Sequence, residues 1–153
     1  MMKKHFSTFI KITFCIYCLL MLWLLFGQRI GVDVPGSYAE RLAVNYNLSP
    51  FKTVKQFISI CKNSTNPYMV RFSFVNLIGN IVMFIPLGFF LPCLFEKIRT
   101  IKRFLLYVTG IILAVEFVQF FTLLGVCDID DLILNIPGAV IGYFVWKGLN
   151  RNT

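Results

Sequence analysis

Four apolar runs constrain this chain more than any other feature of its sequence. They cover residues 9–26, 72–95, 104–126 and about 131–147, and the second carries no charged residue. A helix that crosses the hydrocarbon core of a bilayer needs roughly 20 mostly apolar residues, within a range of about 17 to 25. The fourth run reaches this length only if Lys147 extends its amine to the membrane surface. The runs predict an all-α membrane protein with four transmembrane helices.

The composition supports a lipid environment and excludes several classes of protein. The 153 residues are 58% hydrophobic and 14% charged, whereas a soluble domain is about half apolar and about a quarter charged. This excludes a disordered chain, a collagen-like chain and a soluble enzyme. The length predicts a single domain over residues 1–153. The net charge of +8 indicates membrane topology and not a nucleic-acid partner, because the basic residues flank the apolar runs.

The distribution of basic residues predicts the orientation of the chain in the membrane. Short loops on the cytoplasmic side of a membrane carry more Lys and Arg than loops on the outer side. The connection over residues 96–103 carries four of them, whereas the connection over residues 125–131 carries three acids and no base. With the N-terminus inside, the inner side holds nine basic residues: Lys3, Lys4, Lys11, Lys97, Arg99, Lys102, Arg103, Lys147 and Arg151. The outer side holds six: Arg29, Arg41, Lys52, Lys55, Lys62 and Arg71. Both termini are therefore predicted to be cytoplasmic.

Two segments before the second run need separate interpretation. The first run follows a lysine-rich start that also contains His5, but no A-x-A-like cleavage site follows Phe26, so we interpret it as a retained anchor. The loop over residues 27–71 is too polar to span. Within it, Ser49-Pro50 is typical of a helix start, and Val54, Phe57, Ile58 and Cys61 follow at helical spacing. This predicts a short helix that either lies on the outer leaflet or packs on the bundle.

Polar side chains inside the apolar runs are the candidate functional residues. An ionisable residue in a span is costly and marks a functional site by default, and Glu116 is such a residue. At about 1.5 Å of rise per residue, the polar residues of three spans all fall in the outer half of the membrane. They predict one outward-facing polar cleft lined by Asn76, Asn80, Glu116, Gln119, Asp128, Asp130, Asp131 and Asn135. The alternative is that these amides only bond neighbouring helices, at roughly 0.6 to 2 kcal/mol each, and that the aspartates form a solvated turn.

Cofactor and packing signals are weaker. A single histidine, His5, excludes histidine triads and zinc sites. Asp128, Asp130 and Asp131 are weak candidates for a hard cation, so no metal and no cofactor is predicted. Cys61 and Cys127 could meet outside the membrane, but five cysteines define no disulfide framework. Small residues permit close helix packing. The candidate packing positions are Gly79, Gly88, Gly110, Gly138 and Gly142, and the Gly138/Gly142 pair would suit either an internal helix or a second copy of the chain.

Two motifs in this order resemble the VanZ-like family of bacterial membrane proteins. The first is Asn76-Leu77-Ile78-Gly79-Asn80-Ile81, continuing to Pro86-Leu87-Gly88. The second is Glu116-x-x-Gln119 followed by Asp128-Ile129-Asp130-Asp131 and Asn135-x-x-Gly138. Asn47-x-x-Pro50-Phe51 resembles a further family element. Many relatives carry an arginine in the turn after the glutamine, and residues 125–127 here contain none, so a phosphate-clamping role does not transfer.

The resemblance implies a bacterial plasma-membrane protein and three hypotheses for its function. The family is linked to glycopeptide resistance, chiefly to teicoplanin, so the leading hypothesis is a non-enzymatic protein. Its cleft would bind membrane lipid, a cell-wall precursor or a lipoglycopeptide and so alter how the drug engages the cell surface. The second hypothesis is a membrane-embedded enzyme acting on a lipid or cell-wall precursor, with Glu116 as acid or base. The third is a scaffold in which the polar groups hold helices together.

Overall fold

The computed structural model describes residues 2–27, 30 and 35–150, and the side chains of residues 2–7 are not among those described. Lys3, Lys4 and His5 therefore have no described side chains, and Arg29 and Arg151 lie outside the described residues altogether. The element order is α1 (Met2–Phe26), α2 (Tyr38–Val44), β1 (Tyr46–Asn47), α3 (Lys52–Asn63), α4 (Pro67–Leu94), η2 (Glu96–Ile98), α5 (Ile101–Thr122), β2 (Cys127–Asp128) and α6 (Ile129–Leu149).

Four helices among the described residues are long and apolar enough to cross a membrane, which confirms the predicted fold class. The spanning segments are Thr8–Phe26, Pro67–Leu94, Ile101–Thr122 and Ile129–Leu149. The second begins earlier than predicted because the Asn66 side chain caps it by accepting hydrogen bonds from the amides of Tyr68 and Met69. The third ends before residue 126 because Leu123 adopts a left-handed backbone (φ 56°).

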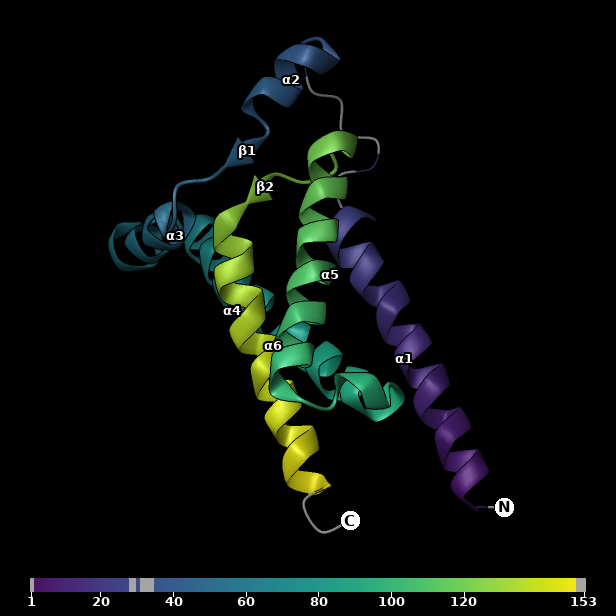
Figure 1. The fold of residues 1–153 in the computed structure, drawn as a ribbon. Coiled ribbons are helices and arrows are strands. Elements are labelled where there is room, and N and C mark those ends of the chain that lie inside the picture. Colours follow the sequence, from purple (N-terminus) through teal and green to yellow (C-terminus); the bar gives the residue numbers. More distant parts are fainter. Residues whose placement is uncertain (1, 28–29, 31–34, 151–153) are drawn as a thin grey trace.

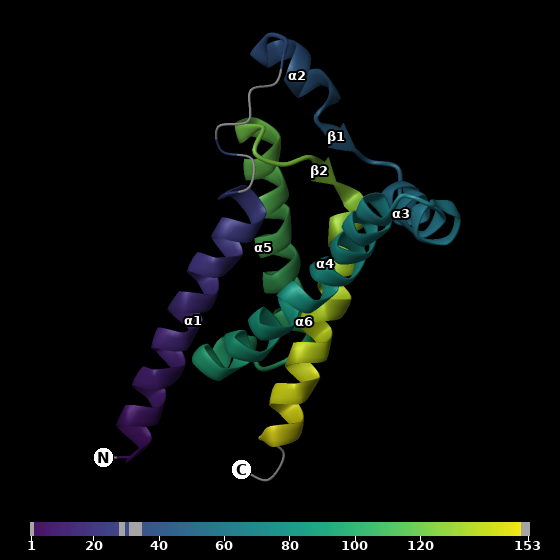
Figure 2. The ribbon, with the colours of Figure 1, turned by 180° about the vertical axis from the view of Figure 1, so that it is seen from behind.

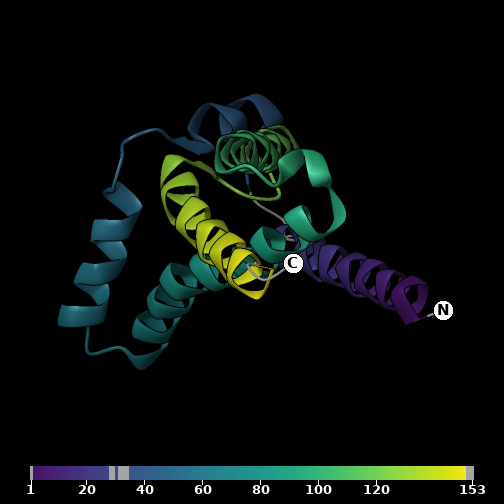
Figure 3. The ribbon, with the colours of Figure 1, turned by 60° about the horizontal axis from the view of Figure 1, so that its bottom comes forward.

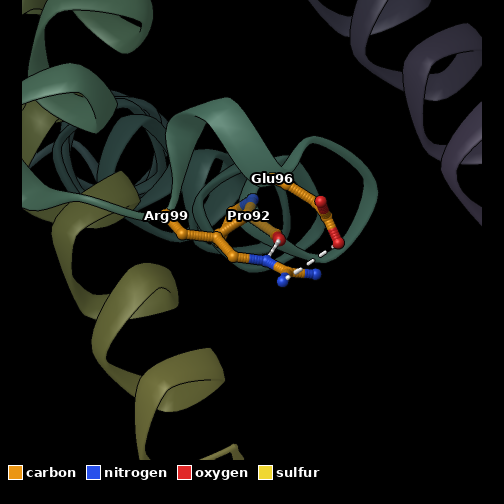
Figure 4. A network of polar contacts seen from close by, with 3 residues as sticks. All are labelled: Pro92, Glu96 and Arg99. Carbon is orange, nitrogen blue, oxygen red and sulfur yellow. Dashed lines mark hydrogen bonds and ion pairs between the residues drawn. The ribbon is translucent and has the colours of Figure 1, made fainter.

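The chain has two distinct ends (Figure 1). We call the end that carries α2, β1, α3 and β2 the loop end, and the opposite end, where α1 begins and α6 ends, the terminal end. The turn between α4 and α5 also lies toward the terminal end in both side views (Figures 1 and 2). There the Arg99 guanidinium pairs with the Glu96 carboxylate at 3.3 Å and donates to the carbonyl of Pro92 at 3.2 Å (Figure 4). These contacts hold a turn that carries four basic residues.

The core centres on a close crossing of α4 and α6. A Cβ added to Gly88 would lie 1.9 Å from the carbonyl oxygen of Ala139, and one added to Gly142 would lie 1.9 Å from that of Ile85. Gly138 is placed in the same way, 2.0 Å from the carbonyl oxygen of Ile81. Only glycine lets two helix backbones approach so closely. Three of the five candidate packing glycines therefore lie between α4 and α6 within one chain.

The other two candidate glycines do not pack inside the chain. Nothing lies within 4 Å of a Cβ added to Gly79 or to Gly110, so neither glycine meets another described helix of the same chain. The physical reason is rotation about the helix axis, because a small residue favours close packing only when it faces a partner helix. Gly79 turns instead toward a groove between α1 and α4, and Gly110 is exposed on α5.

The loop-end cover consists of α2, β1 and α3. In it, β1 pairs with β2 in a short parallel ladder that joins Tyr46 to Cys127 and Asn47 to Asp128. The predicted loop helix forms as α3, but it begins at Lys52, and Phe51 (φ 62°), not Ser49, occupies its N-cap. The Phe57 ring meets the Phe72 ring of α4 at 6.1 Å, so α3 packs on the bundle, as one of the two alternatives proposed.

Candidate functional site

The candidate site is a cluster of carboxylates at the loop end, built around Asp128. Asp128 ends β2 and caps α6, because its Oδ1 accepts from the amide of Asp130 at 2.9 Å. The same oxygen accepts from Asn47 Nδ2 at 3.0 Å. Its second oxygen, Oδ2, accepts from the hydroxyl of Thr53 at 2.6 Å. One side chain therefore ties β1, α3 and α6 together.

Asp130 caps a helix that lies more than 70 residues earlier in the chain. Its carboxylate accepts from the backbone amides of Phe51 and of Val54, the latter at 3.0 Å. The N-terminus of α3 has no side-chain cap of its own. An anion placed there satisfies unpaired amides and interacts favourably with the helix dipole. Asp130 is fully buried, so this carboxylate fixes the start of α3 to the start of α6.

Glu116 supports the same cluster from α5. Its Oε2 accepts from the amide of Asp128 at 2.8 Å, and the side chain is buried, with 6% exposure. The pKa of the neighbouring Cys127 thiol responds to the negative charge of this cluster. Its thiol pKa is raised by burial first and then by the charges of Glu116, Asp128 and Asp131. The four acids from α5, β2 and α6 thus lie within one small region.

Asn80 joins the cluster from α4. Its amide Nδ2 donates to Oδ1 of Asp131 on α6. The recorded partners of Glu116, Asp128 and Asp130 are neutral donors: backbone amides, the Asn47 amide and the Thr53 hydroxyl. A carboxylate that accepts several such bonds is held in place without a cation.

Three predicted site residues lie apart from the cluster. The Asn76 amide donates to the carbonyl of Phe72 in its own helix at 2.7 Å. The Gln119 amide reaches α1, where it donates to the carbonyl of Leu25 at 3.2 Å. Asn135 is buried on α6, and its Oδ1 accepts no hydrogen bond from the described residues. Among the described residues, no hydrogen bond joins Asn135 to Asn80 or to Glu116, which the sequence placed in the same cleft.

Sequence reasoning missed the residues of the loop-end cover that fasten it to α5, β2 and Asp128. Asn45 donates from its side chain to the carbonyl of Phe120 at 3.2 Å and accepts, through its backbone carbonyl, from the amide of Cys127 at 3.1 Å. Asn47 and Thr53 contact Asp128, as described above. Asn47 also accepts from the amide of Ser49 at 3.3 Å, which is an Asx-turn. The sequence Asn47-x-Ser49-Pro50 is typical of this turn, but it does not indicate that Asn47 also binds Asp128.

The geometry limits the chemistry that the cluster can perform. Among the residues that the structure describes, no group of three His, Cys, Asp or Glu side chains is arranged to hold a metal ion. The oxygens of Asp128 and Asp130 are already used as hydrogen-bond acceptors between elements. Asp128 and Asp130 are therefore best described as structural anchors of the loop-end cover.

Two grooves flank the cluster, where the sequence predicted one cleft between the second, third and fourth spans. The first groove has a volume of about 740 Å³, lies between α1 and α4, and includes Asn76 and Asn80 in its wall. The second has a volume of about 550 Å³ and lies between β1 and α5, with Glu116 and Cys127 in its wall. Of the eight predicted polar residues, two line the first groove and Glu116 lines the second. Helix α1, which was not expected to contribute, lines the first groove.

These features define the class of protein: a multi-pass α-helical membrane protein with four spans, whose acidic residues fasten a folded loop onto one end of the bundle. The chain belongs to the VanZ-like family, because the family model described as VanZ/LLP1 matches residues 14–150. It is also 30% identical over 86 residues to Protein VanZ of Enterococcus faecium, a match that covers 56% of this chain. That match spans 53% of the relative's own length, or about half of it. No solved structure matches this chain significantly.

Proposed function

We propose that this chain is a non-enzymatic VanZ-like protein of the bacterial plasma membrane that lowers the engagement of lipid-tailed glycopeptides of the teicoplanin type at the cell surface. The VanZ-like family is linked to glycopeptide resistance, chiefly to teicoplanin, and membership of this family supports the choice of drug class. The observation that carries the proposal is the anchored loop end. Two buried aspartates hold α3 at a fixed position on the loop end of the bundle.

The proposal places the loop end outside the cell and both termini in the cytoplasm. The terminal end carries the turn with Lys97, Arg99, Lys102 and Arg103, and the loop-end connection between α5 and α6 carries only acids. The basic turn belongs on the cytoplasmic side. Labelling of single cysteines from outside the cell should reach a probe placed in α3 and should not reach a probe placed at Thr100. The reverse pattern would overturn this orientation.

In this orientation α3 stands where an acyl-tailed drug enters the membrane. Its exposed lysines, Lys52, Lys55 and Lys62, lie on the side away from α4, while Phe57 faces α4. A drug with a lipid tail partitions into the outer leaflet and meets this surface, whereas a drug without the tail meets little of it. Tolerance conferred by the protein should therefore be greater for teicoplanin than for vancomycin.

A matched pair of acid-to-amide variants tests the proposal. Asp130→Asn replaces an oxygen that accepts from the start of α3 with an amide donor, so α3 should loosen and teicoplanin tolerance should fall. Glu96→Gln alters an exposed ion pair at the terminal end and should leave tolerance unchanged. Both variants need the same membrane level as the wild type by quantitative immunoblot. Equal susceptibility to both drugs, with and without well-expressed protein, would remove resistance from the function of this chain.

One observation favours a second candidate, a membrane-embedded enzyme acting on a lipid or cell-wall precursor. Glu116 lines the apolar groove beside Cys127, where its carboxylate could act as acid or base on a bound lipid. Glu116→Gln should abolish a product detected by lipid analysis if the protein is an enzyme. It should only weaken drug tolerance if the protein is a binder. A lipid profile identical in cells with and without the protein would dismiss the enzymatic alternative.

A further inference from the structure

The groove between α1 and α4 has a shape set by how the two helices meet. They touch toward the terminal end, where the Tyr17 hydroxyl donates to the carbonyl of Met83 at 2.8 Å and the Phe14 and Phe90 rings lie 5.7 Å apart. Toward the loop end the two helices separate in both side views (Figures 1 and 2). With the terminal end turned toward the viewer, most of α1 projects away from the other helices (Figure 3). The groove is therefore a wedge that closes at Tyr17 and opens toward the loop end.

The walls of this groove are apolar over most of its length. Leu20, Met21 and Leu24 come from α1, while Val75, Val82 and Met83 come from α4. Along α4 the groove runs from Tyr68 to Pro86, about 27 Å at 1.5 Å of rise per residue. One leaflet contributes about half of the roughly 30 Å hydrocarbon core. The groove thus covers the depth of one leaflet together with its interface.

The open end of the groove is polar and positively charged. Arg71 lies in its wall, near the start of α4, and its guanidinium makes no ion pair or hydrogen bond with any residue that the structure describes. Tyr68, an aromatic residue typical of the membrane interface, lies beside it in the same wall. Asn76 follows Arg71 by five residues, about 7.5 Å deeper along the axis. Its amide uses one N–H for the Phe72 carbonyl and has a second N–H to offer.

We infer that this groove is a binding site for one glycerophospholipid from the leaflet at the loop end, with its phosphate at Arg71, an ester carbonyl near Asn76 and one acyl chain against α1 and α4. Charge complementarity selects this occupant. A guanidinium with no partner among the described residues, at the mouth of an apolar groove, matches an anionic headgroup joined to a hydrocarbon tail. The inference goes beyond the proposed function and stands whether or not the protein alters drug tolerance.

The lipid would complete the attachment of α1. Only 6% of the residues in the apolar window of α1 are buried within the chain. Phe14 and Tyr17 supply its side-chain contacts with α4, through the Phe90 ring and the Met83 carbonyl. A chain seated in the wedge would fill the space that these helices leave open toward the loop end. A retained lipid would therefore act as a structural part of the bundle and not as a freely exchanging neighbour.

Photolabelling of the full-length protein tests the site. The protein is reconstituted into phosphatidylcholine vesicles doped with phosphatidylglycerol that carries a diazirine at the end of one acyl chain, and labelled peptides are mapped by mass spectrometry. Because the diazirine sits at the end of the chain, about half of the hydrocarbon core below the ester, label should concentrate on the deep facing segments 17–21 and 82–86. Label spread equally over the exposed side of α5, at Leu113 and Phe117, would show a non-selective lipid shell and overturn the site.

Two matched pairs of variants separate the site from general lipid contact. Gly79→Leu fills the groove, and Gly110→Leu adds the same side chain on α5; both glycines have open space around them, so both variants should fold. Only Gly79→Leu should lower the groove label. Arg71→Gln should reduce the label from phosphatidylglycerol about fivefold, the equivalent of one basic contact with an anionic lipid, while Lys55→Gln on α3 should not. Equal effects within either pair would overturn the proposal.

Native mass spectrometry of the protein extracted from cells identifies the occupant directly. A bound phospholipid that is lost in Gly79→Leu supports the inference. A polyprenyl lipid retained in its place would assign the groove to a cell-wall precursor and overturn the choice of occupant. Cysteines introduced at Leu20 and Val75 test whether a second copy of the chain occupies the groove. A covalent dimer formed through these cysteines, and absent from a monomeric control, would assign the groove to that second copy and overturn the choice of occupant.

Discussion

The crossing of α4 and α6 makes Gly142→Ala the sharpest test of the fold. The added methyl carbon would lie 1.9 Å from the carbonyl oxygen of Ile85 and 2.8 Å from the amide nitrogen of Phe89, whereas ordinary contact begins at 3.4 Å. Both obstacles are backbone atoms, so no side chain can rotate away. The two helices must therefore move apart by about 1.5 Å at this point.

The cost follows from the packing that this movement removes. A gap of about 0.5–1 Å already forfeits a quarter to a half of the dispersion energy of the contacts that it opens. Overpacking of a well-packed interface typically costs about 1–3 kcal/mol. Because Gly138 and Gly88 share the same crossing, the whole contact opens together. We expect Gly142→Ala to lose about 3 kcal/mol of unfolding free energy.

The unfolding of Gly142→Ala can be followed by the fluorescence of Trp146. This residue is 9% exposed on α6, and its ring lies 5.7 Å from that of Tyr143, so separation of α6 from the core should change its emission. The background variant Trp23→Phe removes the exposed tryptophan of α1. Unfolding is followed by titrating sodium dodecyl sulfate into mixed micelles. Gly110→Ala, which meets nothing within 4 Å, is the control and should not be destabilised. A Gly142→Ala protein within about 0.5 kcal/mol of the background would refute the reasoning.

Three further predictions test the loop end and α1. Asp130→Asn should cost about 1–3 kcal/mol, since it leaves a buried amide donor unsatisfied, and trypsin should then cut α3 faster than in the wild type. Tyr17→Phe removes the hydrogen bond to Met83 and should cost about 0.6 kcal/mol in the membrane; a cysteine crosslink between α1 and α4 should become less efficient, and an unchanged yield would contradict the contact. Cys127 has a raised thiol pKa because burial and nearby carboxylates disfavour the thiolate. Its alkylation should therefore be slow at pH 8 and should rise as the pH passes above the usual thiol value, and Asp131→Asn should accelerate it at fixed pH.

The sequence alone determined the four spans and the family. A helix in hydrocarbon must satisfy its own backbone hydrogen bonds, so length and apolar composition suffice to identify the spans, without knowledge of their neighbours. The prediction of four spans is confirmed. The errors lie at the helix ends, where Asn66 and Leu123 set the boundaries through local backbone geometry. The motifs around Asn76 and Glu116 were likewise sufficient for the family.

The sequence identified the acidic residues but not what each one binds. Asp128 contacts Asn47 and Thr53 across 81 and 75 positions of the chain, and Asp130 caps α3 across 76 positions. Nothing in the local pattern of either segment specifies its distant partner, because helix caps are normally expected from residues beside the helix. The α3 start was therefore placed at Ser49, when a remote carboxylate supplies the cap.

Tertiary structure alone decided which glycines pack and which faces remain open. Gly79 and Gly142 both occur in apolar helices beside similar residues, yet one faces open space and the other meets a backbone carbonyl. Helical periodicity gives each residue a direction relative to its own axis, but the rotation of that axis toward a partner is a property of the assembled bundle. For the same reason one predicted cleft became two grooves. The packing of α5 against β2 placed Glu116 in the groove beside β1, while α1 contacts α4 near Tyr17 and leaves the space beside Asn76 and Asn80 open.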